Sequence, residues 1–177
     1  MVKKMLKLLS YFIFFIFMLI LFVPKNSIWY FAEKSLKQYE IVISNESLED
    51  SFTTLNVNNL EISAKTVDAG TIKELDFTLL LIYNKLLFTD IELSSLVESY
   101  LPSKIEKLEI SYTLFNPLFV EAEGSGEFGT TKMKFNLQTR ELIVSLHPSK
   151  KMFSSYKNSL KQFKKSETGE YIYAKTF

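Results

Sequence analysis

The sequence predicts an α+β fold, mostly β, in which a single N-terminal transmembrane helix precedes a largely antiparallel curved sheet with flanking helices. Three observations indicate this class. Residues 8–23 contain no charged side chain. Apolar and polar residues alternate with a period of two through most of residues 54–146, which is typical of strands with one covered face. Short turns separate these strands, and short turns join antiparallel neighbours.

The N-terminal segment has the composition of a membrane anchor. Lys3, Lys4 and Lys7 precede the uncharged run, which is followed by Pro24 and Lys25. Its sixteen residues form a helix of roughly 24 Å, and snorkelling lysines extend this toward the ~30 Å of a bilayer core. A signal peptide is the alternative, although no small-x-small cleavage motif surrounds Pro24. The predicted anchor residues include Leu8, Phe12, Phe15, Leu19 and Val23.

The lysines around the span predict its orientation. Three precede it and one directly follows, and cytoplasmic flanks carry the excess of positive charge. We therefore expect a single-pass protein of the inner membrane, with its N-terminus in the cytoplasm and its C-terminal domain in the periplasm. Interfacial residues are expected to be the three N-terminal lysines together with Trp29 and Tyr30. The alternative for this aromatic group is the buried face of a first helix.

Residues 1–25 form the predicted cytoplasmic stub and anchor, and residues 26–177 form one β-rich extracytoplasmic domain. The first 25 residues hold four of the 21 basic residues and none of the 20 acidic ones, so the remainder has a net charge of −3. Such a weakly acidic domain has no electrostatic reason to bind nucleic acid. Cysteine is absent, which excludes disulfides and thiolate metal sites. We expect no cofactor.

The first element after the anchor is a helix over residues 27–40. Ser27 can cap it, and apolar residues recur on one side at helical spacing. The period then changes to two, and the alternation predicts strands at 54–57, 60–65, 75–83, 86–93, 108–114, 119–123, 133–137, 142–146 and 170–175.

The connections between these strands have their own signals. Turns are expected at Asn84-Lys85 and Asn116-Pro117, where Asn and Pro favour reversal of the chain, and at 138–140, between two alternating stretches. A phase slip at Thr89-Asp90 predicts a β-bulge. A short helix is expected over residues 94–100, since a serine can cap it and Pro102 ends it.

Motifs of catalysis are weak. Gly124 to Gly129 matches G-x-G-x-x-G, but the period-2 pattern that follows starts no helix. We therefore expect a glycine-rich hairpin or bulge and not a dinucleotide loop. His147 is the only histidine and is expected at the surface. Glu121 and Glu123 lie on one strand face, where they are a solvated pair or, as an alternative, the carboxylates of a hydrolase. No catalytic or metal-binding residue is assigned.

The segment Lys150–Lys165 is predicted to be an amphipathic helix. It contains six lysines and no acidic residue, and an apolar stripe runs along the opposite side. Three uses of this helix stay open: packing on the sheet with lysines outward, lying on anionic lipid, or filling a partner's groove. The candidate lipid or partner face comprises Lys157, Lys161, Lys164, Phe153 and Leu160.

A family resemblance rests on the run of predicted hairpins. It includes Leu79–Leu93, Asn116–Phe119, Gly124–Gly129, Phe135–Leu137 and Arg140–Leu142. With the basic N-terminus, bulky span and juxtamembrane helix, these residues make about residues 1–150 resemble the bitopic type II secretion system protein N family, which is similar in turn to AsmA-like envelope proteins. The resemblance implies an inner-membrane component of a secretion or envelope-biogenesis apparatus and carries over no catalytic residues.

Two non-enzymatic functions are expected from these features. The first is a membrane-anchored periplasmic interaction or scaffold component of a secretion or envelope-biogenesis complex, with other inner-membrane or periplasmic proteins as partners. The alternative is a lipid- or hydrophobe-binding envelope module, because sixteen Phe residues and the row Leu75–Tyr83 can line a groove for acyl chains. A covered apolar sheet face favours a protein partner, and an open one favours lipid.

Overall fold

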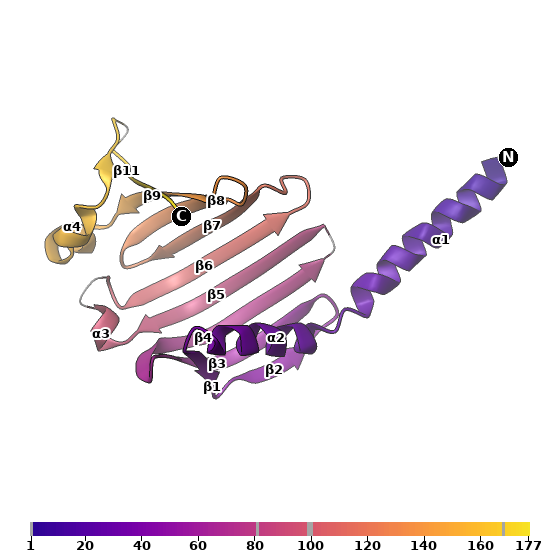
Figure 1. The fold of residues 1–177 in the computed structure, drawn as a ribbon, viewed down its shortest axis with the longest axis horizontal. Coiled ribbons are helices and arrows are strands. Elements are labelled where there is room, and N and C mark those ends of the chain that lie inside the picture. The colour runs from indigo at the N-terminus through magenta and orange to yellow at the C-terminus, as the bar shows by residue number, and fades with distance from the viewer. Residues whose placement is uncertain (1, 81, 99–100, 168) are drawn as a thin grey trace.

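In the computed structural model, the domain is built on one antiparallel sheet (Figure 1). The structure describes residues 2–80, 82–98, 101–167 and 169–177. The helices are α1 (Val2–Leu21), α2 (Lys25–Lys37), α3 (Ser95–Glu98), α4 (Lys150–Ser155) and α5 (Lys157–Leu160). The strands are β1 (Ile41–Ser44), β2 (Ser47–Asp50), β3 (Thr54–Ala64), β4 (Val67–Leu80), β5 (Tyr83–Leu93), β6 (Lys104–Thr113), β7 (Phe119–Gly126), β8 (Gly129–Asn136), β9 (Glu141–Pro148), β10 (Lys164–Lys165) and β11 (Tyr171–Thr176).

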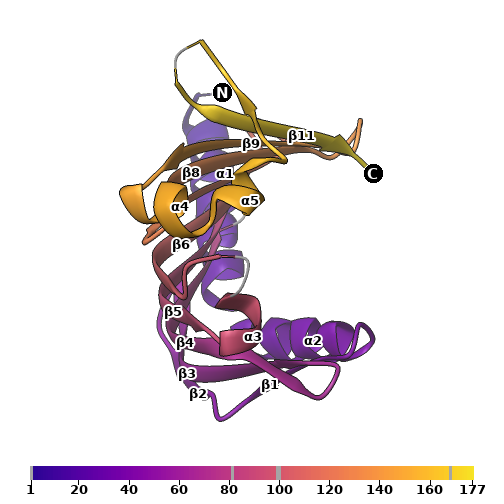
Figure 2. The ribbon, with the colours of Figure 1, turned by 90° about the vertical axis from the view of Figure 1, so that its left-hand side faces the viewer.

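Within the described residues, eleven strands form one sheet in the order β1-β3-β4-β5-β6-β7-β8-β9-β11-β10, and β2 also pairs with β3. Every pair is antiparallel. Figure 2 shows that the sheet curls, with α2 on its concave side near β1 and β3 and with α4 and α5 near β9. The prediction of a mostly-β α+β fold with an antiparallel sheet is confirmed.

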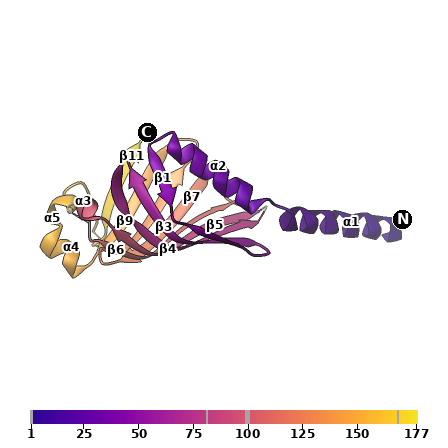
Figure 3. The ribbon, with the colours of Figure 1, turned by 90° about the horizontal axis from the view of Figure 1, so that it is seen from below.

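The N-terminal helix is shorter than the predicted span. No single helix among the described residues is both long and apolar enough to cross a bilayer, and only α1 and α2 together, bent by 50°, pass that test. The uncharged part of α1 begins at Leu8 and ends with the helix at Leu21, a length of roughly 21 Å against a bilayer core of ~30 Å. Figure 3 shows α1 projecting from one end of the sheet, opposite to α4 and α5.

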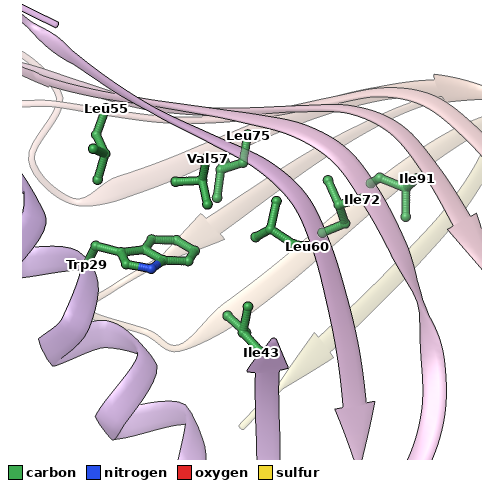
Figure 4. Packing of buried hydrophobic residues seen from close by; sticks show 8 residues of the cluster. All are labelled: Trp29, Ile43, Leu55, Val57, Leu60, Ile72, Leu75 and Ile91. Carbon is green, nitrogen blue, oxygen red and sulfur yellow. The ribbon is translucent and has the colours of Figure 1, made fainter. Parts of the chain in front are cut away.

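The core lies between α2 and the first strands. Trp29 of α2 is 6% exposed and belongs to a cluster with the fully buried Leu55 and Val57 of β3. Figure 4 shows the Trp29 ring facing this group, with Ile43 of β1 beside it. Lys25 closes the junction before α2: its Nζ is 2.9 Å from Asp50 Oδ1, and the side chain is only 4% exposed.

One row of irregular residues bends the neighbouring strands β3 to β6. Asn59 and Asp90 adopt φ values of 58° and 52°, a left-handed conformation that Asn and Asp tolerate. In a regular strand, residues on one face are two apart. Here Val57 and Leu60, on either side of Asn59, both face the core although they are three apart. Phe88 and Ile91, on either side of Asp90, have the same spacing. The phase slip predicted at Thr89-Asp90 is therefore present, and it keeps apolar side chains on the concave face as the strands bend. The predicted bulge is not, because the register of β5 with β4 and with β6 continues unshifted past Asp90.

The connections agree with the predictions in part. The turns at Asn116-Pro117 and 138–140 are confirmed, and Asn136 Oδ1 accepts from Gln138 N at 2.9 Å. The turn predicted at Asn84-Lys85 is wrong, because β5 starts at Tyr83 and Tyr83 pairs with Leu80. The helix predicted over 94–100 is present as α3, and its last two predicted residues lie outside the described ones. Strands β1 and β2 were not predicted, since both are four residues long.

The single helix predicted over Lys150–Lys165 is wrong. The backbone leaves the helical region at Tyr156 (φ −121°, ψ 29°), and α5 ends at Leu160. Lys164 and Lys165 instead form β10, which pairs with β11. Ser149 caps α4 by accepting from Met152 N at 3.2 Å. The break at Tyr156 lets both Met152 and Leu160 reach the buried cluster around Leu146.

Candidate functional site

The concave face of the sheet is apolar across its full width. The register places eight residues, one on each of eight strands, in one row across the sheet. This row consists of Leu55, Phe77, Leu86, Ile110, Ala122, Met133, Val144 and Tyr173. Because successive residues point to opposite faces, the neighbouring row lies on the convex face: Asn56, Asp76, Leu87, Glu109, Glu123, Lys132, Ser145 and Ile172.

Helices cover only part of this apolar row. The helix α2 packs on β1, β2 and β3, whereas α3 contacts β5 and α4 contacts β9. Leu55 under α2 is fully buried. Ile110, Ala122 and Met133, on the three central strands β6 to β8, are only half-buried. We call the concave face of β5 to β9 the apolar groove.

The groove deepens into a cavity near α4 and α5. The cavity has a volume of about 250 Å³. This is slightly below the ~300 Å³ at which small-molecule pockets begin, so it can hold the end of a chain while the remainder lies along the open face. Its lining includes Ile105, Leu108, Phe128, Met133, Val144 and Met152.

Gly124 shapes the floor of the groove. A Cβ at this position would lie 3.2 Å from the Thr131 methyl group and 3.4 Å from Leu108. The missing side chain therefore lets these residues, together with Phe128, close over the strand. Thr131 is buried, and its hydroxyl donates to Ser145 O at 3.1 Å, which leaves its methyl group toward Gly124. The glycine-rich motif thus forms strand and hairpin, as predicted, and contributes to an apolar surface.

The far end of the groove is closed by the C-terminal segment. Met152 and Leu160 are buried against Leu146 of β9. Two aromatic contacts hold this segment to β11: Phe153 lies with its ring centroid 5.8 Å from that of Tyr171, and Phe163 lies 5.7 Å from Tyr173.

An ion pair fastens the same end from outside. Lys151 Nζ lies 2.6 Å from Glu127 Oε2, in the turn between β7 and β8. The hydrogen bond from Lys151 lowers the pKa of Glu127 below its ordinary value. This ion pair holds α4 to the β7–β8 turn, at the closed end of the groove.

The convex face carries the charged residues that were considered for catalysis. Glu121 pairs with Lys134 at 3.1 Å, and Glu123 pairs with Lys132 at 3.1 Å. These are cross-strand ion pairs on an exposed surface, a common arrangement on the wet side of a sheet. His147 Nε2 lies 3.2 Å from Glu170 Oε1. Among the described residues, no group of His, Asp and Glu is arranged to hold a metal ion.

The predicted anchor residues share one exposed helix. Leu8, Phe12, Phe15 and Leu19 lie on α1 and are exposed, whereas Val23 follows the end of the helix. Lys3, Lys4 and Lys7 lie on the first two turns of α1 and are exposed. Together they make α1 an exposed apolar helix with three lysines at its N-terminal end.

The two aromatic residues predicted to lie at the membrane interface differ in exposure. Tyr30 is exposed, but Trp29 points into the core. Trp29 is therefore not a headgroup contact, because α2 turns its indole toward β3. The alternative of a buried helix face holds for Trp29.

The residues predicted to form one lipid or partner face on the C-terminal segment lie on different elements and differ in burial. Leu160 is buried in the groove end, and Phe153 is half-exposed beside Tyr171. Lys157, Lys161 and Lys164 are exposed, but they lie on α5, after it and on β10 in turn. They do not form one helix face, and that part of the prediction is wrong.

No family model, curated protein or solved structure matches the chain. The resemblance to the type II secretion system protein N family and to AsmA-like proteins therefore stays a prediction.

The residues that make the groove were missed at the sequence level. Ile110 and Met133 were recognised as alternating apolar positions, but their alignment with Ala122 depends on strand register. Alternation within one strand does not indicate which residues of other strands stand beside it.

Proposed function

We propose that this protein binds lipid acyl chains along the apolar groove while α1 holds it at the inner membrane. The observation that supports this most directly is that the apolar row on β5 to β8 is only half-buried. A soluble domain usually covers such a face, and a large contiguous apolar surface marks a binding site. The open face also meets the condition that favours lipid over a protein partner.

Acyl chains fit the groove better than compact ligands. The lining combines Leu, Ile, Val, Met and Phe side chains, and the charged residues of the neighbouring row lie on the other face of the sheet. An extended apolar ligand gains about 0.8 kcal/mol per buried methylene without needing a polar partner. The cavity at the α4–α5 end would receive the chain terminus.

The proposed placement follows from α1. Its uncharged part begins after Lys7. The side chains of Lys3, Lys4 and Lys7 can extend to the membrane interface, and the bilayer can thin to match the length of the helix. The N-terminal lysines favour a cytoplasmic N-terminus and a periplasmic domain. The scaffold function in a secretion or envelope-biogenesis complex remains the second hypothesis, with the groove then serving an apolar protein segment.

A binding assay with a blocked groove tests the proposal. The full chain in mild detergent is titrated with a fluorescent fatty acid. Ala122→Trp adds a bulky side chain in the middle of the groove, and we expect at least about tenfold weaker binding, which corresponds to about 1.4 kcal/mol. Glu121→Trp, the next residue on the convex face of the same strand, is the matched control and is expected to bind as the unsubstituted chain does.

The result that contradicts the proposal is equal binding by both variants, or no saturable binding by the unsubstituted chain. Thermal unfolding of each variant accompanies the titration, so that loss of the fold is distinguished from a filled groove. Met133→Gln serves as a second groove variant of similar volume, which weakens binding by polarity and not by bulk.

A further inference from the structure

The turns at one end of the sheet are apolar. They are the β2–β3 loop, the β4–β5 turn and the β6–β7 turn, and α1 leaves the domain at this same end (Figures 1 and 3). Turn tips normally carry polar residues. Here large apolar side chains are exposed, and Phe115 reaches 84%. We define the apolar rim as Phe52, Ile82, Leu114, Phe115 and Leu118.

The rim is one continuous edge. Backbone hydrogen bonds join its neighbouring segments: Leu79 N donates to Thr53 O at 3.2 Å, and Leu114 N donates to Ile82 O at 3.0 Å. Leu118 O accepts from Leu137 N at 2.8 Å, which extends the edge to the β8–β9 turn. Exposed apolar side chains of neighbouring turns therefore lie along one edge of the sheet.

Charge distinguishes this end from the opposite one. Residues 51–53, 79–83, 113–119 and 136–140 contain no acidic residue, although the chain has 20, and they contain Arg140, its only arginine. At the opposite end the β3–β4 turn is formed by Lys65 and Thr66, and the β7–β8 turn contains Glu127. The nearest flanking acidic residues are Asp50, which pairs with Lys25, and Glu141. The loops themselves therefore bring no negative charge that anionic lipid headgroups would repel.

The rim is fixed next to the apolar helix. Phe17 of α1 lies with its ring centroid 6.0 Å from that of Phe52 in the rim. The Lys25–Asp50 pair fastens the chain just after α1 to the end of β2. The apolar surface of α1 therefore continues into the rim, so the medium that surrounds the base of the helix also meets the hairpin tips.

We propose that the apolar rim inserts into the surface of the lipid bilayer beside α1. The occupant is the bilayer, because the rim continues an exposed apolar helix and lacks acidic residues. This inference rests on the membrane association of α1 in the proposed function, but it does not require the groove to bind a ligand. Concave-face positions on β6 (Ile110 and Tyr112) and on β8 (Met133 and Phe135) lead from the cavity to this edge. When the rim is inserted in the bilayer, the open end of the groove therefore faces lipid.

Depth-dependent quenching of tryptophan fluorescence tests the proposal. The full chain is reconstituted into vesicles of phosphatidylethanolamine and phosphatidylglycerol, with and without bromine on the acyl chains. Phe115→Trp places a tryptophan on the rim, and the signal of Trp29 is subtracted with the unsubstituted chain. We expect brominated lipid to remove more than about half of the added emission, because interfacial side chains lie about 5–10 Å into the headgroup–acyl boundary.

Phe153→Trp is the matched control at the opposite end of the sheet, where the side chain is also exposed. Its emission is expected to stay within error of that in unbrominated vesicles. Equal quenching at both positions overturns the proposal, as does blue-shifted emission at position 115 without quenching, which indicates that a second copy or another protein covers the rim. If the unsubstituted chain does not float with vesicles, α1 does not hold the protein at a membrane, and the insertion of the rim is overturned. Weak fatty-acid binding alone contradicts only the proposed function.

Discussion

The two halves of the concave face use the same sequence pattern with different outcomes. On β3, α2 covers the concave face, and Leu55 and Val57 lose all contact with solvent. On β5 to β8, the same row continues through Ile110 and Met133, which stay half-buried. The first half stabilises the fold. The second half exposes apolar surface at a cost in solvation free energy, and this cost is the reason for proposing that a ligand binds there.

The largest effect is expected from truncating one residue in each half. Leu55→Ala should lower the free energy of unfolding by about 3 kcal/mol, because it leaves a cavity under α2. Ile110→Ala on the same row should cost about 1 kcal/mol, since part of that side chain is already in water. Urea denaturation of the full chain in detergent, followed by Trp29 fluorescence, measures both. Equal losses would show that the open half is packed like the covered one.

The attachment of α2 gives the next effect. Asp50→Ala leaves the buried Lys25 ammonium without its carboxylate and should cost about 2 kcal/mol. Lys25→Met in the same chain should restore most of this loss, because an apolar side chain of similar length suits a buried site. The double-mutant cycle is read from unfolding midpoints. Additive losses would contradict a coupled pair that holds α2 over β3.

The smallest effect concerns the ion pair that fastens the closed end of the groove. Lys151 lowers the pKa of Glu127, so the pair stabilises the fold above the ordinary pKa of Glu (about 4.3). This contribution is lost as the pH falls through the lowered pKa. Lys151→Met should therefore unfold more easily than the unsubstituted chain at neutral pH, and the two should converge at low pH. A difference in midpoint that persists in acid would contradict this assignment.

The sequence predicts elements better than it predicts their neighbours. Alternation identifies most strands, and the change of phase at Asp90 is present in β5 although the register with its neighbours does not shift there. The hairpin at Leu80–Tyr83 gives no turn signal, because its tip is apolar, and the expected turn was displaced to Asn84. That failure has a physical reason in the apolar rim, where the usual chemistry of turns is absent.

The candidate site was less accessible to sequence reasoning. The Lys150–Lys165 segment has helical spacing throughout, yet pairing of Lys164 and Lys165 with β11 overrides this local preference. The groove depends on strand order and on Gly124, whose role comes from the closeness of Leu108 and Thr131. Long-range register brings these residues together, and no local pattern contains it.

Photocrosslinking tests the central claim most directly. A photoreactive benzophenone side chain replaces Ile110 on the concave face or Glu109, its neighbour on the convex face, in the full chain expressed in cells. After irradiation, mass spectrometry identifies what is attached to each peptide. We predict a lipid adduct at position 110 and none at position 109. Lipid at both positions or at neither, or a protein adduct at position 110, would contradict the claim that the open half of the sheet binds acyl chains.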